Sequence, residues 1–356
     1  MGFVSKELLA KHNVIEDVFD YKDLDIDEKI LKIYSYFENS FLELYGSYAD
    51  LFKIKDYCFY IKDNNKCNAF ALTRKGYNII GITNGYPILL SQKLDEKYFR
   101  SIVLAGIGND EPLQKAYIDL YEDREFVFDK FILDCSIKFT FNHEFQHIMQ
   151  FSSSKLKRND FLLQENWAED NFDIKLHAWE FDADRMASYE VLKYVFRTHA
   201  NFKVKSDEKL KCLLYVGCAS MIITNCLFYF GVMNQLGPQL SVRKLEFYEK
   251  KFSHPHPLVR CINIMEYYFD SITTDLPRLK MDSQELLNNT LVITKLYFNM
   301  LIPTQNVISE LFKDLGKHLD SINKYIDELY DCAVQDEAIR NLLLLRNVEF
   351  EDVQPT

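Results

Sequence analysis

Residues 139–150 decide the fold, and they read Phe-Thr-Phe-Asn-His-Glu-Phe-Gln-His-Ile-Met-Gln. His143 and His147 are four residues apart, so on a helix they share one face and both imidazoles can reach one metal ion. Glu144 stands between them and can act as the general base on a water molecule that the metal holds. The pattern His-Glu-x-x-His therefore predicts a hydrolytic zinc site, which needs nitrogen ligands and one open position for the water.

The residues around this pattern favour a buried helix. Residues 131–151 contain neither glycine nor proline, and apolar side chains recur at Ile132, Phe139 and Ile148. The polar residues 152–160 are expected to end the helix in a loop. The alternative is a core helix whose histidines merely satisfy hydrogen bonds, but packing alone does not explain a glutamate between two histidines.

A second helix is expected to supply the third metal ligand. Within residues 177–187, Glu180 and Asp184 are one helical turn apart and face the same way. Glu180 can bind the metal, while Asp184 can accept a hydrogen bond from the far nitrogen of a ligand histidine and so fix its tautomer. The alternative for Asp184 is a surface salt bridge with an arginine or lysine. Three other acids are rival ligands to Glu180, namely Glu165, Glu169 and Asp170.

Two further histidines occur in residues 253–257, which read Ser-His-Pro-His-Pro. The prolines should hold His254 and His256 in an extended loop that leads into a helix. Either histidine could donate a hydrogen bond to the oxyanion of a tetrahedral intermediate, and Arg260 could hold a carboxylate. The alternative is a rigid turn whose histidines are exposed to solvent.

The composition favours a fold made mainly of helices. Among 356 residues there are only 11 glycines and 8 prolines, whereas 48% of the residues are apolar. Three short runs, residues 57–61, 68–73 and 77–83, read as strands, with a tight turn between the last two. We therefore expect an α+β protein that is mainly helical and has a small antiparallel sheet, whose edge strand could pair with an extended peptide.

Charge and cysteine usage limit the partners and the compartment. The net charge of -11, with no basic run to offset it, disfavours nucleic acid as a partner. Eight scattered cysteines, none in a Cys-x-x-Cys pair, are expected to be reduced core residues of a cytoplasmic protein without a signal peptide. The apolar run 213–233 would nearly span a membrane. No second span or strong basic flank accompanies it, so a buried helix is favoured and no membrane partner is expected.

Taken together, these segments resemble the zinc metallopeptidases of the gluzincin type. That group's ligand arrangement is matched by His143-Glu144-x-x-His147 followed by Glu180-x-x-x-Asp184. The resemblance implies that Zn²⁺ is held by His143, His147 and Glu180. It also implies that Glu144 takes a proton from the attacking water and passes it to the leaving amine.

Two more stretches are similar to the family that includes the heat-shock membrane protease HtpX and the CAAX prenyl proteases. Residues 68–71, Asn-Ala-Phe-Ala, are similar to a strand segment of that family, and His254-Pro-x-x-x-x-Arg260 is similar to its downstream loop. The size, the motif and the expected cytoplasmic character look more narrowly like the Lit phage-exclusion peptidase family. Members of that family are cytosolic zinc proteases that cleave a translation factor when a phage peptide appears.

These resemblances imply a zincin-like metallopeptidase core at residues 56–265, flanked by an N-terminal helical region, residues 1–55, and a C-terminal helical accessory region, residues 266–356. The implied activity is that of an endopeptidase with a protein or peptide substrate, regulated by an activator protein or peptide. The alternative is a zincin-like binding or regulatory module without proteolytic activity. The intact Glu144 weighs against this alternative, because a purely structural metal site has no use for a general base.

Overall fold

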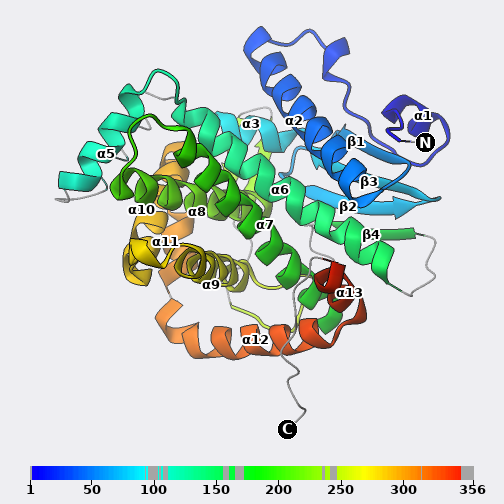
Figure 1. Cartoon of the computed structure of the whole chain (residues 1–356). Coiled ribbons are helices and arrows are strands. Elements are labelled where there is room, and N and C mark those ends of the chain that lie inside the picture. The colour runs from blue at the N-terminus through cyan, green and yellow to red at the C-terminus, as the bar shows by residue number, and fades with distance from the viewer. Residues whose placement is uncertain are drawn as a thin grey trace.

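The computed structural model shows a mainly helical protein with a small sheet on one side (Figure 1), so the prediction of a mainly helical α+β protein is confirmed. The structure describes residues 2–92, 94, 103, 106, 111–154, 160–164, 172–234, 237–240, 247–313 and 315–345. The rival ligands Glu165, Glu169 and Asp170 lie outside the described residues.

The sheet contains the three predicted strands and a fourth. These are β1 (Tyr57–Lys62), β2 (Ala69–Arg74), β3 (Tyr77–Thr83) and β4 (Asp160–Gln164), in the order β1-β3-β2-β4. β2 pairs antiparallel with both β3 and β4, but β1 runs parallel to β3. The prediction of an antiparallel sheet is therefore wrong for the β1–β3 pair, and the sheet is mixed.

A tight hairpin causes this topology. Lys75 and Gly76 both have positive φ, 50° and 82°, as a two-residue hairpin turn requires. The hairpin folds β3 back beside β2, and β3 then lies between β2 and β1. The chain reverses once between β1 and β2, in residues 63–68, and again at the hairpin, so β1 and β3 run in the same direction.

The N-terminal segment covers the outer edge of β1. Val4 donates its backbone N–H to the Tyr57 carbonyl at 2.8 Å, and Phe19 donates to the Ile61 carbonyl at 2.8 Å. Between them lies the short helix α1 (Lys6–Lys11), which is followed by mostly irregular chain up to α2 (Glu28–Phe52). The N-terminal region, residues 1–55, was expected to be helical, but residues 12–20 are not. Residues 17–19 instead bond residues 61–63 at the end of β1.

Four long helices form the centre of the molecule (Figure 1). The motif helix is α6 (Phe128–Ser153), slightly longer than the predicted 131–151. It packs between the sheet and α7 (Ile174–Asn201), while α8 (Asp207–Phe230) and α9 (Pro257–Asp275) complete the core. Side chains at N-caps fix where α7 and α8 begin, because Asp173 accepts from the Lys175 N–H and Ser206 accepts from the Lys209 N–H.

The remaining elements surround this centre. They are α3 (Gly85–Ser91), α5 (Glu111–Glu122), the hairpin of β5 (Gly231–Asn234) and β6 (Gly237–Leu240), α10 (Ser283–Leu301), α11 (Val307–Lys313), α12 (Leu315–Gln335) and α13 (Glu337–Leu345). In Figure 1, α12 runs along the lower side of the molecule; it packs on α7, and α13 packs on α6. One buried apolar cluster takes in residues from all three predicted regions, for example Phe37, Ile148 and Tyr297. The division at 1–55, 56–265 and 266–356 stays a prediction.

Helix α8 accounts for the long apolar run in the sequence. Within the described residues it is the one helix that is long and apolar enough to cross a membrane, and its apolar window is wholly buried inside the protein. The favoured interpretation, a buried core helix, agrees with this placement. All eight cysteines are free thiols and seven of them are buried. Five of the buried ones lie on α6, α8 and α9.

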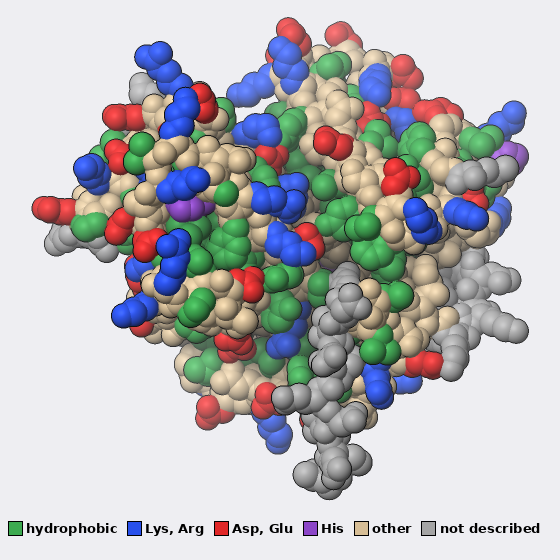
Figure 2. Space-filling model, viewed as in Figure 1, with side chains coloured by type: hydrophobic (Ala, Val, Ile, Leu, Met, Phe, Trp, Pro, Cys, Tyr) green, Lys and Arg blue, Asp and Glu red, His purple; other side chains and the backbone are tan. Residues whose placement is uncertain are grey.

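The surface mixes charges of both signs. On the face shown in Figure 2, basic and acidic side chains are interspersed with small apolar areas. Ionised side chains at the surface form local pairs such as Lys203–Glu125 at 3.0 Å and Lys250–Glu328 at 2.7 Å. Such exposed pairs contribute little to stability.

Candidate metal centre

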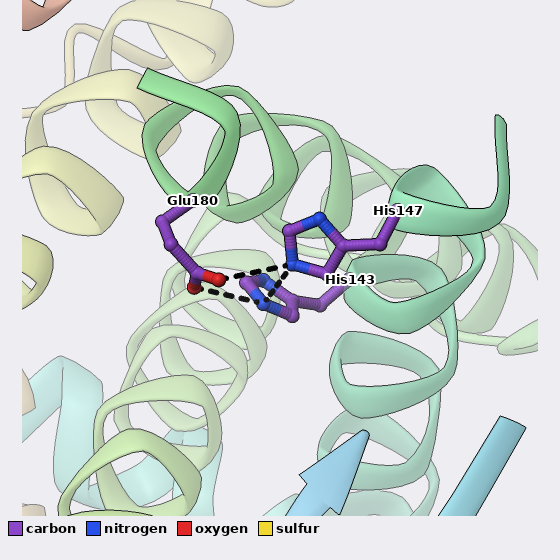
Figure 3. A group of neighbouring side chains, drawn as sticks. All are labelled: His143, His147 and Glu180. Carbon is purple, nitrogen blue, oxygen red and sulfur yellow. Dashed lines mark hydrogen bonds and ion pairs between the residues drawn. The ribbon is translucent and has the colours of Figure 1, made fainter. Parts of the chain in front are cut away.

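Helices α6 and α7 bring together the two motif histidines and Glu180. The His143 Nε2 and His147 Nε2 atoms are 3.1 Å apart, and they lie 3.3 Å and 3.2 Å from the two oxygens of Glu180. Figure 3 shows the three side chains converging from the two helices. One ligand atom from each residue lies within 4.8 Å of the others, so this buried group could hold a metal ion.

The donor set fits a metal because of what surrounds Glu180. The residue is 1% exposed, and neither of its carboxylate oxygens accepts a well-formed hydrogen bond in the described structure. The Arg260 guanidinium lies 3.6 Å from Oε2, too far for a hydrogen bond, so a metal ion would supply the close partner that a buried carboxylate needs. Two imidazole nitrogens and a carboxylate oxygen are also the donor types that zinc takes in hydrolytic sites.

A buried ion pair lies beside the Nδ1 atom of His143, on the other side of the ring from Glu180. The His143 Nδ1 atom lies 3.0 Å from Asp184 Oδ1, and the Arg260 guanidinium donates to both oxygens of Asp184, from Nε at 2.8 Å and from Nη2 at 2.7 Å. Asp184 is fully buried, so it makes neither an exposed salt bridge nor a contact with water. Because a carboxylate can only accept, His143 carries its proton on Nδ1 and turns Nε2 towards Glu180.

The acids of this group attract positive charge. Burial alone would raise the pKa of the Asp184 carboxyl, but Arg260 outweighs burial and holds that pKa below its usual value. Burial alone would lower the pKa of His143, but its contacts with Asp184 and Glu180 outweigh burial and raise the pKa well above 6.5. The site therefore stabilises a cation at His143, and a proton and a metal ion compete for it.

The other predicted site residues are also buried. Glu144 follows His143 on α6 and is 1% exposed. His254 places its Nε2 atom 3.4 Å from Glu180 Oε1, while its Nδ1 atom is 2.9 Å from the Ser253 hydroxyl. His254 therefore reaches the edge of the metal centre, and the alternative of an exposed turn is wrong.

His256 has a different place. Its Nδ1 atom accepts the Leu258 N–H at 3.1 Å and so forms the N-cap of α9. Burial, together with a neighbouring histidine, lowers the pKa of His256 to about 3, so the ring stays neutral. Its contacts assign it to holding the start of α9, which also carries Arg260, while its predicted catalytic role stays a prediction.

Two residues of the site escaped the sequence argument, Gln150 and Asp182. The Gln150 Oε1 atom is 2.8 Å from His147 Nδ1, and Gln150 Nε2 donates to Asp182 Oδ2 at 2.9 Å. A signal was present, because each motif histidine is followed three residues later by a glutamine, Gln146 after His143 and Gln150 after His147. Glutamine recurring at helical spacing on a buried helix needs hydrogen-bond partners.

No family model matches this chain, and searches of curated proteins and of solved structures likewise find no match. What the centre does has to be argued from the chemistry of its residues.

Proposed function

We propose that the protein is a zinc-dependent endopeptidase of the gluzincin type. The observation that carries the proposal is the convergence of His143, His147 and Glu180 within 4.8 Å, on a helix pair that also carries Glu144. When bound by these three residues, zinc would supply a Lewis acid that acidifies water and polarises the peptide carbonyl.

The protein's own residues would carry the proton and hold the substrate. Glu144 accepts a proton from the water whose oxygen adds to the carbonyl carbon. It then gives that proton to the amine as the C–N bond breaks. His254, beside Glu180, is placed to donate a hydrogen bond to the carbonyl oxygen, on which negative charge develops.

The sheet offers one edge to an extended peptide. The N-terminal segment already occupies the outer edge of β1. Among the described strands, none pairs with the outer edge of β4. A substrate that adds as a strand would therefore lie along β4, which follows α6 in the chain.

Burial of the centre favours a regulated peptidase. His143, His147 and Glu180 are 1–2% exposed, and His254 is 7% exposed. A peptide must displace some covering segment before it reaches Glu180. This supports a protein or peptide activator, as in a cytoplasmic protease of the phage-exclusion type. The same burial is the observation that favours the second candidate, a zincin-like binding or regulatory module that never admits a substrate.

The test compares the wild-type protein with Glu144→Gln. Zinc content should be the same in both, while hydrolysis of a fluorogenic peptide library falls by at least about 100-fold in the variant because the general base is lost. The matched control is Glu190→Gln, which alters a glutamate of α7 that pairs with Lys193 away from the centre. Undiminished hydrolysis by Glu144→Gln would overturn the mechanism. A wild-type protein that binds zinc but cleaves no peptide, with or without candidate activators, would favour the binding module.

A further inference from the structure

Four polar side chains form a stripe along the buried helix α6. His143, Gln146, His147 and Gln150 stand at positions i, i+3, i+4 and i+7, so they share the face that packs on α7. All four are at most 2% exposed. A glutamine buried to this degree must satisfy both its amide hydrogens and its carbonyl oxygen inside the protein.

The amide nitrogen of Gln150 faces two groups that can only accept. It donates to Asp182 Oδ2 at 2.9 Å and to the Trp179 carbonyl at 3.1 Å. A carboxylate and a backbone carbonyl have no hydrogen to give, so a flipped amide would bring three oxygens together. The orientation of the Gln150 side chain therefore follows from its neighbours, and Gln146 stabilises the same Asp182 oxygen with a hydrogen bond of 2.6 Å.

This orientation determines the proton on His147. With its nitrogen turned to Asp182, Gln150 must present Oε1 to His147, and that oxygen lies 2.8 Å from Nδ1. An amide oxygen only accepts, so Nδ1 carries the hydrogen. The lone pair of His147 is then on Nε2, which lies 3.2 Å from Glu180 Oε1.

We propose that Gln150, oriented by Asp182, is the positioning residue that fixes the metal-binding tautomer of His147. The assignment rests on the metal centre proposed above. Two hydrogen bonds link these groups: the amide of Gln150 on α6 donates to the carboxylate of Asp182 on α7, and its oxygen accepts from the imidazole of His147 one turn earlier. Glu180 and Asp182 thus serve the same histidine from two sides, Glu180 at Nε2 and Asp182 through Gln150 at Nδ1.

The two histidines are consequently held by different chemistry. Asp184, an ionised carboxylate clamped by Arg260, lies against His143, whereas a neutral amide lies against His147. A carboxylate partner makes an imidazole more basic than an amide partner does. His147 should be the weaker of the two nitrogen ligands, and its tautomer should be the more sensitive to a change in its partner.

The experiment uses the full chain with Gln150→Met, which keeps the length of the side chain and removes its hydrogen bonds to Asp182, Trp179 and His147. Zinc affinity, measured by competition with a chromophoric chelator, should fall by about 10- to 100-fold, the usual effect of removing the partner of a ligand histidine. The matched control is Thr294→Val, which removes a buried hydroxyl that donates to the Thr290 carbonyl on α10, a helix that packs on α8. Its zinc affinity should stay close to that of the wild type. Thermal melting of each sample shows that the variants are folded.

A second readout reports the tautomer directly. In metal-free wild-type protein labelled with ¹⁵N-histidine, the His147 ring should carry its hydrogen on Nδ1, and in Gln150→Met it should become a mixture of tautomers. Equal losses of zinc affinity in Gln150→Met and Thr294→Val would overturn the proposal, since that pattern indicates a general effect of core packing. So would a wild-type His147 ring with its hydrogen on Nε2. If the wild type binds no zinc, the metal centre fails, and the tautomer measurement still decides whether Gln150 acts on His147.

Discussion

Helices α6 and α8 are both almost completely buried, but the buried glutamines of α6 and two buried hydroxyls of α8 make hydrogen bonds in different directions. On α8, Ser220 donates to the Val216 carbonyl and Thr224 donates to the Ser220 carbonyl, so both hydroxyls are satisfied by their own helix. On α6, Gln146 and Gln150 reach across to α7 instead.

This difference separates polar side chains that only pack from polar side chains that help to build a site. A hydroxyl bonded to the carbonyl four residues earlier needs nothing from a neighbouring element. A polar group bonded across an interface fixes the register of two helices, and it is costly if its partner is lost. Burial alone would have ranked the two helices equally, since most side chains of both are buried.

The largest expected effect is on zinc content, and it follows from removing a metal ligand from α6 or α7. His147→Ala and Glu180→Ala should each lower zinc content from about one ion per chain to none, because the remaining two ligands do not hold the ion. The measurement is metal analysis of purified protein. His199→Ala serves as the control, because it removes a histidine from the last turn of α7 that bonds the Ser206 carbonyl.

Different outcomes have different meanings for the ligand set. Zinc retained in Glu180→Ala would move the third ligand to one of the rival acids, Glu165, Glu169 or Asp170. Zinc lost in His199→Ala as well would mean that metal binding depends on the stability of α7 rather than on the three converging residues.

The next effect is on stability, and it concerns the ion pair behind His143. Asp184→Ala should lower the free energy of unfolding by about 3–5 kcal/mol, because the buried Arg260 loses the carboxylate that accepts hydrogen bonds from its Nε and Nη2. Glu180, 3.6 Å from the guanidinium, remains as a weaker partner and places the expected loss towards the lower end. Denaturant unfolding, carried out with a metal chelator in the buffer, measures this loss of unfolding free energy without a contribution from metal binding.

The double variant Asp184→Ala/Arg260→Met tests whether that loss of stability comes from the unpaired charge of Arg260. It removes the charge as well as its partner, so it should be more stable than Asp184→Ala alone. A double variant that is less stable than the single one by the full cost of a second lost residue would show that the two side chains act independently.

The sequence predicted the parts of the site that depend on one helix at a time. Histidines four residues apart, and Glu180 with Asp184 at the same spacing, share a helical face whatever the tertiary structure is. The link from Asp182 to Gln150 could not be predicted in this way. Asp182 is two residues from Glu180, on another face of α7, and it reaches the stripe on α6 only because of how the two helices pack.

The sheet gives the same lesson. Local turn chemistry predicted the hairpin of β2 and β3, but the parallel pairing of β1 depends on which side of that hairpin it joins. β4 was not predicted, because its five residues lie next to a polar stretch that reads as a loop, and its pairing with β2 joins residues about ninety positions apart in the chain.

The smallest expected effect lies on α8 and tests the other half of the comparison. Ser220→Ala removes a hydroxyl that bonds only within its helix, at 2.7 Å from the Val216 carbonyl. Since that carbonyl keeps its backbone partner, the free energy of unfolding should fall by about 1 kcal/mol or less, and zinc affinity should not change. A loss of zinc affinity comparable to that of Gln150→Met would contradict the distinction between the two helices. It would mean that the α6–α7 interface responds to any change in the buried core, and that zinc affinity does not depend specifically on the polar stripe of α6.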